Sequence, residues 1–130
     1  RHDVTLYPDV VPALSALSER FAVVAVSNGN ADISRLGIGD YFQGQISAST
    51  VGVKKPDRQI FHMACELLEM DPAQVLHVGD HPLEDVIGAQ QAGLCAAWVN
   101  RNGDDWEYEE TPHAEVSDLA QLVRLLDTAT

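Results

Sequence analysis

The sequence is poor in cysteine, in paired metal-binding histidines and in long apolar runs, and each shortage excludes a class of protein. Its 130 residues include two cysteines, Cys65 and Cys95, which form no CxxC pattern. We expect both to be free thiols in a reducing cytoplasm, which excludes a disulfide framework. The five histidines form no HxxxH or Cys/His pattern, so the sequence predicts no zinc site. No apolar run reaches the roughly 18 residues of a membrane span.

Positive charge is scarce as well. Eight lysine and arginine residues face 20 acidic ones, which gives a formal charge of −12. Such a surface disfavours nucleic acid and anionic membranes, so neither is expected as a partner, and its simplest role is solubility. The chain opens at Arg1 without a signal-peptide pattern. We therefore expect a cytoplasmic protein, and a trimmed product or fragment of a longer one.

What the sequence does contain is an alternation of helix-like and strand-like segments. Runs such as 21–26 are continuously apolar, which is typical of strands buried on both faces of a parallel sheet. The alternation predicts one α/β domain over residues 1–130, with helices on both faces of an open parallel sheet. We expect helices at 9–19, 31–36, 57–70, 83–92 and 118–126, strands at 21–26, 45–48, 75–78 and 94–99, and a loop at 100–113.

Ser27-Asn28-Gly29 directly follows the first predicted strand. Ligands of such folds bind beyond the carboxyl ends of the strands. A hydroxyl and exposed backbone amides at that edge can donate hydrogen bonds to a phosphate oxygen. The same residue types also form ordinary turns, so this segment alone leaves both interpretations open.

Lys55-Pro56-Asp57 lies before the clearest predicted helix. The proline restricts Lys55 to extended backbone geometry and helps to begin the helix near Asp57. An ammonium group held there could neutralise a carboxylate and a phosphate together. The alternative is that Lys54 and Lys55 are an exposed pair in a loop.

Gly79-Asp80 ends another buried strand, and Asp85 follows in the first turn of the next helix. Mg²⁺ is bound in proteins by one or two carboxylates together with water. Asp80 and Asp85 are therefore the candidate metal ligands. Asp85 could instead stabilise the helix dipole, and Glu84 is the rival second carboxylate.

Taken together, the three segments resemble the haloacid dehalogenase superfamily of hydrolases, and within it bacterial phosphatases with a small helical cap. The resemblance covers about residues 6–99. It implies a three-layer α/β/α, Rossmann-like fold and Mg²⁺-dependent hydrolysis of a small phosphorylated metabolite. The matching motifs are Val23 to Gly29, Gly52 to Asp57, and Val78 to Asp80 with Asp85, supported by Leu36-Gly37, Tyr41-Phe42, Ile60-Phe61 and Gly88 to Gly93.

The resemblance also implies a role for each matched residue. Ser27 would bind the transferring phosphoryl group, Asn28 would contribute its backbone amide, and Gly29 would belong to the same substrate-binding turn. Lys55 would stabilise the charges of the nucleophile and the phosphate. Asp80 would ligate Mg²⁺, and Asp85 would do so directly or through water. The metal-independent branch that cleaves carbon–halogen bonds resembles the chain less at Gly79-Asp80.

The family's first motif, an apolar strand ending in Asp-x-Asp-x-Thr, is absent from the sequence, and Asp3-Val4-Thr5 imitates it poorly. That motif supplies the nucleophile and the general acid/base. Its strand would be central, between the strands ending at Ser27 and Gly79. We expect those two strands to pair directly, or a second copy or a separate N-terminal fragment to fill the position. An open, solvated gap between ordered strands would contradict this expectation.

Three functions remain open at this point. In the first, the chain is most of the core of a phosphatase that is active as a complete protein. In the second, it is a non-catalytic module that binds phosphate, metal or a partner. In the third, it is a truncated artefact with an exposed sheet edge. In each case we expect these 130 residues to be inactive alone.

Overall fold

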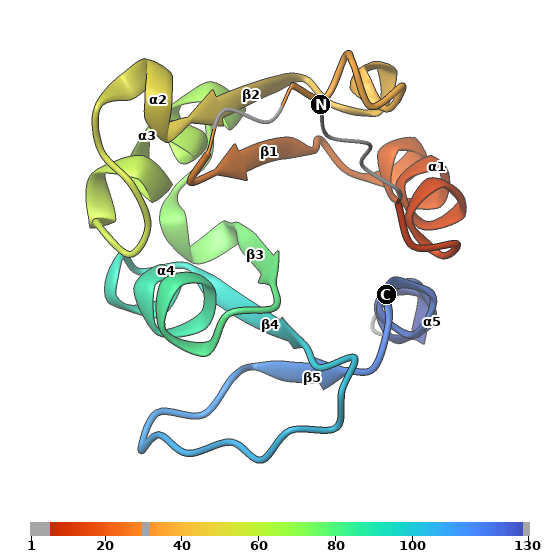
Figure 1. The fold of residues 1–130 in the computed structure, drawn as a ribbon, viewed down its shortest axis with the longest axis vertical. Helices are drawn as coiled ribbons and strands as arrows, with labels where there is room; N and C mark the ends of the chain where they lie inside the picture. Colours follow the sequence, from red (N-terminus) through yellow and green to blue (C-terminus); the bar gives the residue numbers. More distant parts are fainter. Residues whose placement is uncertain (1–5, 30–31, 129–130) are drawn as a thin grey trace.

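The computed structural model describes residues 6–29 and 32–128 (Figure 1). Parallel strands and helices alternate along the chain. The α-helices are α1 (Val10–Arg20), α2 (Ala48–Val51), α3 (Arg58–Leu68), α4 (Gly88–Gln91) and α5 (Leu119–Thr128). The strands are β1 (Val24–Ser27), β2 (Gly44–Ser47), β3 (Leu76–Gly79), β4 (Cys95–Val99) and β5 (Ala114–Val116). The 3₁₀ helices are η1 (Gly39–Tyr41) and η2 (Pro72–Gln74), and η3 (Pro82–Ile87) is a π-helical segment before α4. No helix in the described ranges is long and apolar enough to span a membrane.

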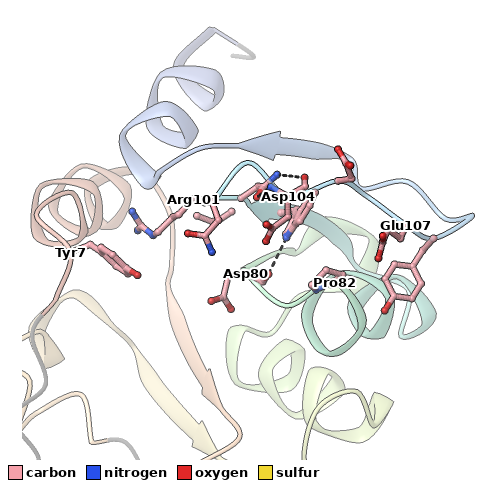
Figure 2. A pocket seen from close by; sticks show the side chains of 12 residues that line it. Tyr7, Asp80, Pro82, Arg101, Asp104 and Glu107 are labelled. Atoms are coloured by element: carbon pink, nitrogen blue, oxygen red, sulfur yellow. Dashed lines mark hydrogen bonds between the residues drawn. The ribbon is translucent and has the colours of Figure 1, made fainter.

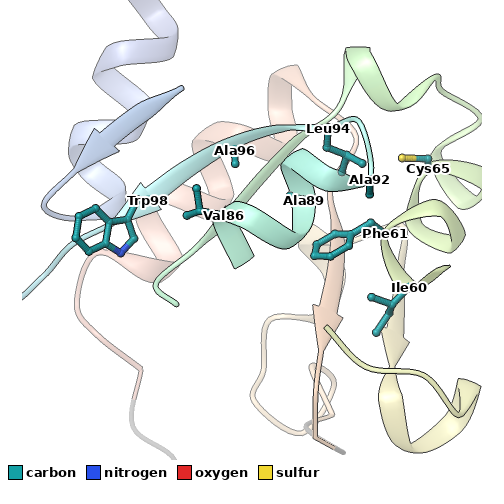
Figure 3. Packing of buried hydrophobic residues seen from close by; sticks show 9 residues of the cluster. All are labelled: Ile60, Phe61, Cys65, Val86, Ala89, Ala92, Leu94, Ala96 and Trp98. Atoms are coloured by element: carbon teal, nitrogen blue, oxygen red, sulfur yellow. The ribbon is translucent and has the colours of Figure 1, made fainter. Parts of the chain in front are cut away.

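The predicted three-layer arrangement is confirmed. Helices α1 and α5 lie together on one side of the strands, and α2, α3 and α4 lie on the other (Figure 1). Alternate side chains of β4 point to opposite faces, as the pleat of a strand requires. Ala96 and Trp98 join the core beneath α3 and α4 (Figure 3). Ala97 and Val99 join the core beneath α1 and α5.

Helix α3 is the clearest case of a sequence signal that fixes local structure. The side chain of Asp57 accepts a hydrogen bond from the backbone N–H of Gln59, 2.9 Å away, and so caps the helix. Apolar residues at helical spacing then face the core, and Ile60 and Phe61 are completely buried. This packing fixes the position of the Lys55-Pro56 segment immediately before the helix.

The five strands form two separate sheets in the described residues. Strands β1 and β2 pair in parallel, and β3, β4 and β5 form a second parallel sheet. No ladder joins β1 to β3. Every residue of β1 and β3 is half-buried, whereas four of the five residues of β4 are buried. Of the three expected arrangements, direct pairing of the two strands is therefore wrong, and their facing edges stay open among the residues that the structure describes.

Three local expectations also differ from the structure. Residues 32–36 form turns, in which the N–H groups of Arg35 and Leu36 both bond to the carbonyl of Asp32, so the short helix predicted at 31–36 is wrong over its described part. Residues 30–31 lie outside the described residues. Strand β1 begins at Val24, three residues later than predicted. Strand β5 was not predicted, because three residues carry too short a pattern to indicate a strand.

Candidate active site

The three predicted segments meet at the carboxyl edge of the two sheets, and the side chain of Asn28 connects them. Its Oδ1 accepts the backbone N–H of Lys55 at 2.6 Å, and its Nδ2 donates to the backbone carbonyl of Lys55 at 3.1 Å. The same Nδ2 donates to Oε1 of Glu84 at 3.1 Å. Segments far apart in sequence are thereby fixed to one another.

Asp85 is the centre of the site's charge network. Its Oδ1 accepts from Nζ of Lys55 at 2.6 Å and from Nε2 of His77 at 2.9 Å, and its Oδ2 accepts from the backbone N–H of His81 at 3.0 Å. The Asp85 side chain is 5% exposed and that of Lys55 is 13% exposed. The alternative of Lys55 as an exposed loop residue is therefore wrong, although Lys54 beside it is exposed as expected.

The electrostatic state of Asp85 follows from this surrounding. Burial by itself raises the pKa of the carboxyl, but the hydrogen bond and charge of His77 and the ammonium of Lys55 together outweigh it. The pKa of Asp85 is held well below its usual range, so the group is a carboxylate at neutral pH. Lys55 is therefore engaged in an ion pair.

Gly79 allows this carboxylate to lie against the end of β3. A Cβ atom at position 79 would lie 2.2 Å from Cγ of Asp85. The π-helical η3, in which the N–H of Val86 bonds to the carbonyl of His81 five residues earlier, holds Asp85 in this inward position. Local winding of this kind occurs frequently at functional sites.

Asp80 is exposed and lies beside a cavity of about 440 Å³. Figure 2 shows its carboxylate between Tyr7 and Arg101 on one side and Pro82 and Glu107 on the other. The backbone carbonyl of Asp80 accepts from the indole N–H of Trp98 at 3.0 Å. Among the described residues its carboxylate has no hydrogen bond or ion pair, so it is available to a ligand.

Ser27 and Gly29 occupy the turn after β1. The hydroxyl oxygen of Ser27 accepts the backbone N–H of Gly29 at 3.1 Å. The hydroxyl hydrogen of Ser27 is not used by this contact, so the group can still donate to an incoming anion.

The described residues can supply some, but not all, of the ligands that a hard divalent cation such as Mg²⁺ needs. Asp80 offers a carboxylate without a partner in the described structure, and Mg²⁺ accepts such a ligand with several waters. Asp85 already receives three donors, which leaves about one of its four lone-pair sites for water or metal. The described residues contain no group of three or more His, Cys, Asp or Glu placed to hold a metal by themselves.

Sequence reasoning missed His77. A polar residue inside the apolar strand 75–78 was the available signal, but the histidines matched no metal pattern, so His77 received no role. In the structure its ring packs edge-on against the ring of Phe61, with 5.0 Å between the ring centroids. Its Nε2 is hydrogen-bonded to Oδ1 of Asp85. The pairing of Asp9 with Arg101, which lines the cavity, was missed as well.

Comparison with known proteins places these features in a family. The family model described as haloacid dehalogenase-like hydrolase matches residues 1–93. A 5-amino-6-(5-phospho-D-ribitylamino)uracil phosphatase of Escherichia coli, YigB, is 38% identical over 117 residues, which is 87% of this chain and 49% of that protein. An (S)-2-haloacid dehalogenase of Pseudomonas sp. strain YL is 32% identical over 130 residues, covering 95% of this chain and 56% of the enzyme.

Solved structures give the same picture. The crystal structure of a 2-haloacid dehalogenase from Pseudomonas syringae pv. tomato superposes with a TM-score of 0.95 at 40% identity. The match covers 99% of this chain and 56% of the dehalogenase. The chain thus spans about half the length of the relatives it matches, and those relatives include both phosphatases and dehalogenases.

Proposed function

The chain belongs to the haloacid dehalogenase-like hydrolases, and from this we propose that the complete protein hydrolyses phosphate monoesters with the help of Mg²⁺. The observation that carries the proposal is the charge balance of the site. Asp80 presents to the cavity a carboxylate that has no partner among the described residues, while the ammonium of Lys55 is already paired with Asp85. An anionic substrate beside Asp80 therefore needs added positive charge, which a divalent cation supplies.

Each residue then has a defined task. Ser27 and the backbone amide of Asn28 would hold the phosphoryl oxygens, with Gly29, whose N–H donates to the Ser27 hydroxyl, in the same turn. Lys55 would bring positive charge to the reacting group while Asp85 fixes its direction. Asp80 would ligate Mg²⁺, and Asp85 would act directly or through a bound water. When bound, the metal would stabilise negative charge on the phosphoryl oxygens.

The groups that attack phosphorus and transfer the proton are expected outside these 130 residues. We infer that the 130 residues alone are inactive and that a strand from an N-terminal segment or from a second copy of the chain completes the sheet. The open edges of β1 and β3 support this inference, since parallel strand edges need hydrogen-bond partners. The free thiols of Cys65 and Cys95 favour a cytoplasmic location.

Carbon–halogen hydrolysis is the second candidate function, because a dehalogenase is among the similar structures at 40% identity. It accounts less well for Asp80, because no described residue compensates the charge of its carboxylate beside an anionic 2-haloacid. A non-catalytic module that binds phosphate or metal is the remaining alternative. All three candidates predict different responses to metal and substrate.

The deciding experiment uses the complete protein, with the sequence that flanks these residues. Release of p-nitrophenol from its phosphate ester is measured with Mg²⁺ and with EDTA, and chloride release from 2-chloropropionate is measured in parallel. We expect phosphatase activity that EDTA abolishes and no chloride release. Chloride release that survives EDTA would establish the dehalogenase instead.

Two variants sharpen the assignment. Asp80→Asn keeps the size of the side chain but removes its charge, and we expect it to weaken Mg²⁺ activation by at least tenfold. Asp71→Asn changes an exposed carboxylate outside the site and serves as the matched control. Undiminished Mg²⁺-dependent turnover in Asp80→Asn would overturn the metal assignment.

A further inference from the structure

Two asparagines at the carboxyl edge make the same unusual set of contacts. Asn28 follows the last residue of β1, and its carboxamide accepts the N–H and donates to the carbonyl of one residue, Lys55. Its second N–H contact is to the carboxylate of Glu84. We call this arrangement an asparagine clasp: the asparagine side chain bonds to the N–H and the carbonyl of one other residue, and its amide also donates to a glutamate.

Asn100 repeats the arrangement after the last residue of β4. Its Oδ1 accepts the N–H of Asp104 at 2.9 Å, and its Nδ2 donates to the carbonyl of Asp104 at 2.8 Å and to Oε2 of Glu115 at 3.0 Å. The second clasp shapes the loop beside the cavity, whereas the first holds the segment that carries Lys55. The recurrence indicates that this geometry is how the fold fixes loops at its carboxyl edge.

We propose that Asn28 and Glu84 are positioning residues, which set the backbone of Lys55 and thereby aim its ammonium group at Asp85 and the reacting phosphoryl. The catalytic part of this inference rests on the proposed function. The positioning part stands on the contacts alone. Because the lysine side chain is long and flexible, fixing its backbone is the available way to limit where Nζ can reach.

The chemistry of the clasp requires a carboxamide. The N–H of Lys55 needs an acceptor and its carbonyl needs a donor, and asparagine offers both side by side. An aspartate of the same shape has no donor, and it would place its charge against the Lys55 carbonyl and the Glu84 carboxylate. Asn28→Asp therefore removes both donated hydrogen bonds of the clasp with little change in size, and Asn28→Ala also removes the acceptor of the Lys55 N–H.

The clasp also spans a division in the sheet. Asn28 follows β1, which pairs only with β2, while Glu84 lies in η3 beside β3. No strand ladder joins these two parts in the described residues. The Asn28 contacts therefore place the Lys55 segment relative to both halves of the site.

The first test measures backbone amide exchange by NMR in the complete protein. In Asn28→Ala, which has no acceptor, we expect the Lys55 amide to exchange at least about tenfold faster, and in Asn28→Asp, whose carboxylate can still accept from it, we expect a smaller change. The amide of Asp57, which bonds to the carbonyl of Lys54 at 2.9 Å, is the internal control and should keep its rate. Asn100→Ala is the matched variant, which should release the Asp104 amide and leave the Lys55 amide protected.

The second test is steady-state hydrolysis of p-nitrophenyl phosphate with Mg²⁺. A displacement of about 1 Å at a reacting group can cost about a hundredfold in rate. We expect kcat of Asn28→Asp to fall by about ten- to a hundredfold with a smaller change in KM. Glu84→Gln keeps an acceptor for Asn28 but removes the charge, so we expect it to lower kcat less than Asn28→Asp does. When Asn28→Asp and Glu84→Gln are combined, the introduced glutamine can donate to the introduced aspartate, so the second substitution should partly restore kcat.

The outcomes test separately whether Asn28 positions Lys55 and whether this positioning contributes to catalysis. Unchanged exchange of the Lys55 amide in both Asn28 variants would overturn the clasp. Faster exchange with unchanged kcat, in a protein that is an active phosphatase, would overturn its catalytic role. If the unaltered protein hydrolyses no phosphate ester, the proposed function fails, and the exchange result alone decides whether Asn28 positions Lys55.

Discussion

Lys55 and Asp85 form a short, largely buried ion pair that joins the segment before α3 to η3. Nζ of Lys55 lies 2.6 Å from Oδ1 of Asp85, and the two side chains are 13% and 5% exposed. A buried carboxylate is costly without a partner, and the chain supplies His77 and the His81 backbone as further donors. The contacts that hold the ammonium group of Lys55 in place therefore also contribute to folding.

Lys55→Met should lower the free energy of unfolding by about 2–3 kcal/mol, because it removes a charge-assisted hydrogen bond from a buried carboxylate. Urea denaturation at neutral pH measures the change. Lys54→Met is the matched control, since Lys54 is its exposed neighbour, and should differ from the unaltered chain by less than about 0.5 kcal/mol. Equal effects of the two substitutions would contradict the structural role of the pair.

Gly79→Ala should be more damaging than its one added methyl group suggests. The new Cβ would lie 2.2 Å from Cγ of Asp85, so the carboxylate would have to leave Lys55 and His77. We expect unfolding to become easier by about 3 kcal/mol or more. Gly29→Ala, where a Cβ would have its nearest contact at 4.0 Å, is the control and should unfold near the wild-type denaturant concentration.

Much of this site could be predicted from sequence because its residues follow strong local signals. Apolar runs ending at Ser27 and Gly79 place those residues at one sheet edge, and the capping Asp57 fixes the start of α3. Parallel strands then bring the three segments together. The family resemblance, drawn from the same residues, is confirmed by the match to residues 1–93.

The remaining features depend on contacts that no local pattern encodes. The pairing of His77 with Asp85 requires that β3 and η3 face each other, and the hold of Asn28 on Lys55 spans 27 residues. The three-residue strand β5 has no periodicity of its own and forms because it pairs with β4. Tertiary partners decide each of these features, so the sequence alone leaves them open.

Asp9 should give the fold a distinct pH dependence. Its carboxylate accepts both terminal nitrogens of Arg101, at 3.0 and 2.9 Å, and the N–H of Leu119 at 2.9 Å. The hydrogen bond from Arg101 is the main cause that lowers the pKa of Asp9 from 3.8. A carboxyl whose pKa is lowered by folding stabilises the fold fully above its unfolded pKa and loses this contribution as pH falls through the folded value.

Asp9→Asn should therefore destabilise the chain near neutral pH and much less in acid. We expect the free energy of unfolding to be lower by about 1–3 kcal/mol at pH 7. The difference should shrink below a pH of about 4, because the wild-type carboxyl then becomes protonated and loses its charge. Urea unfolding of the wild-type protein and of Asp9→Asn from pH 7 to pH 3 measures the difference. A difference that stays constant over this range would show that Asp9 acts through packing and not through its charge.

Backbone exchange should reveal whether another segment completes the sheet. Within residues 6–29 and 32–128, amides of β1 and β3 that point away from β2 and β4 have no ladder partner, whereas β4 pairs on both sides. We expect those β1 and β3 amides to exchange at least about tenfold faster in the dilute 130-residue chain than in the complete protein, with β4 unchanged as the control. Protection that rises with the concentration of the 130-residue chain would indicate a second copy in the open position. Protection only in the complete protein would indicate its own flanking segment, and full protection in the dilute short chain would contradict the open edges.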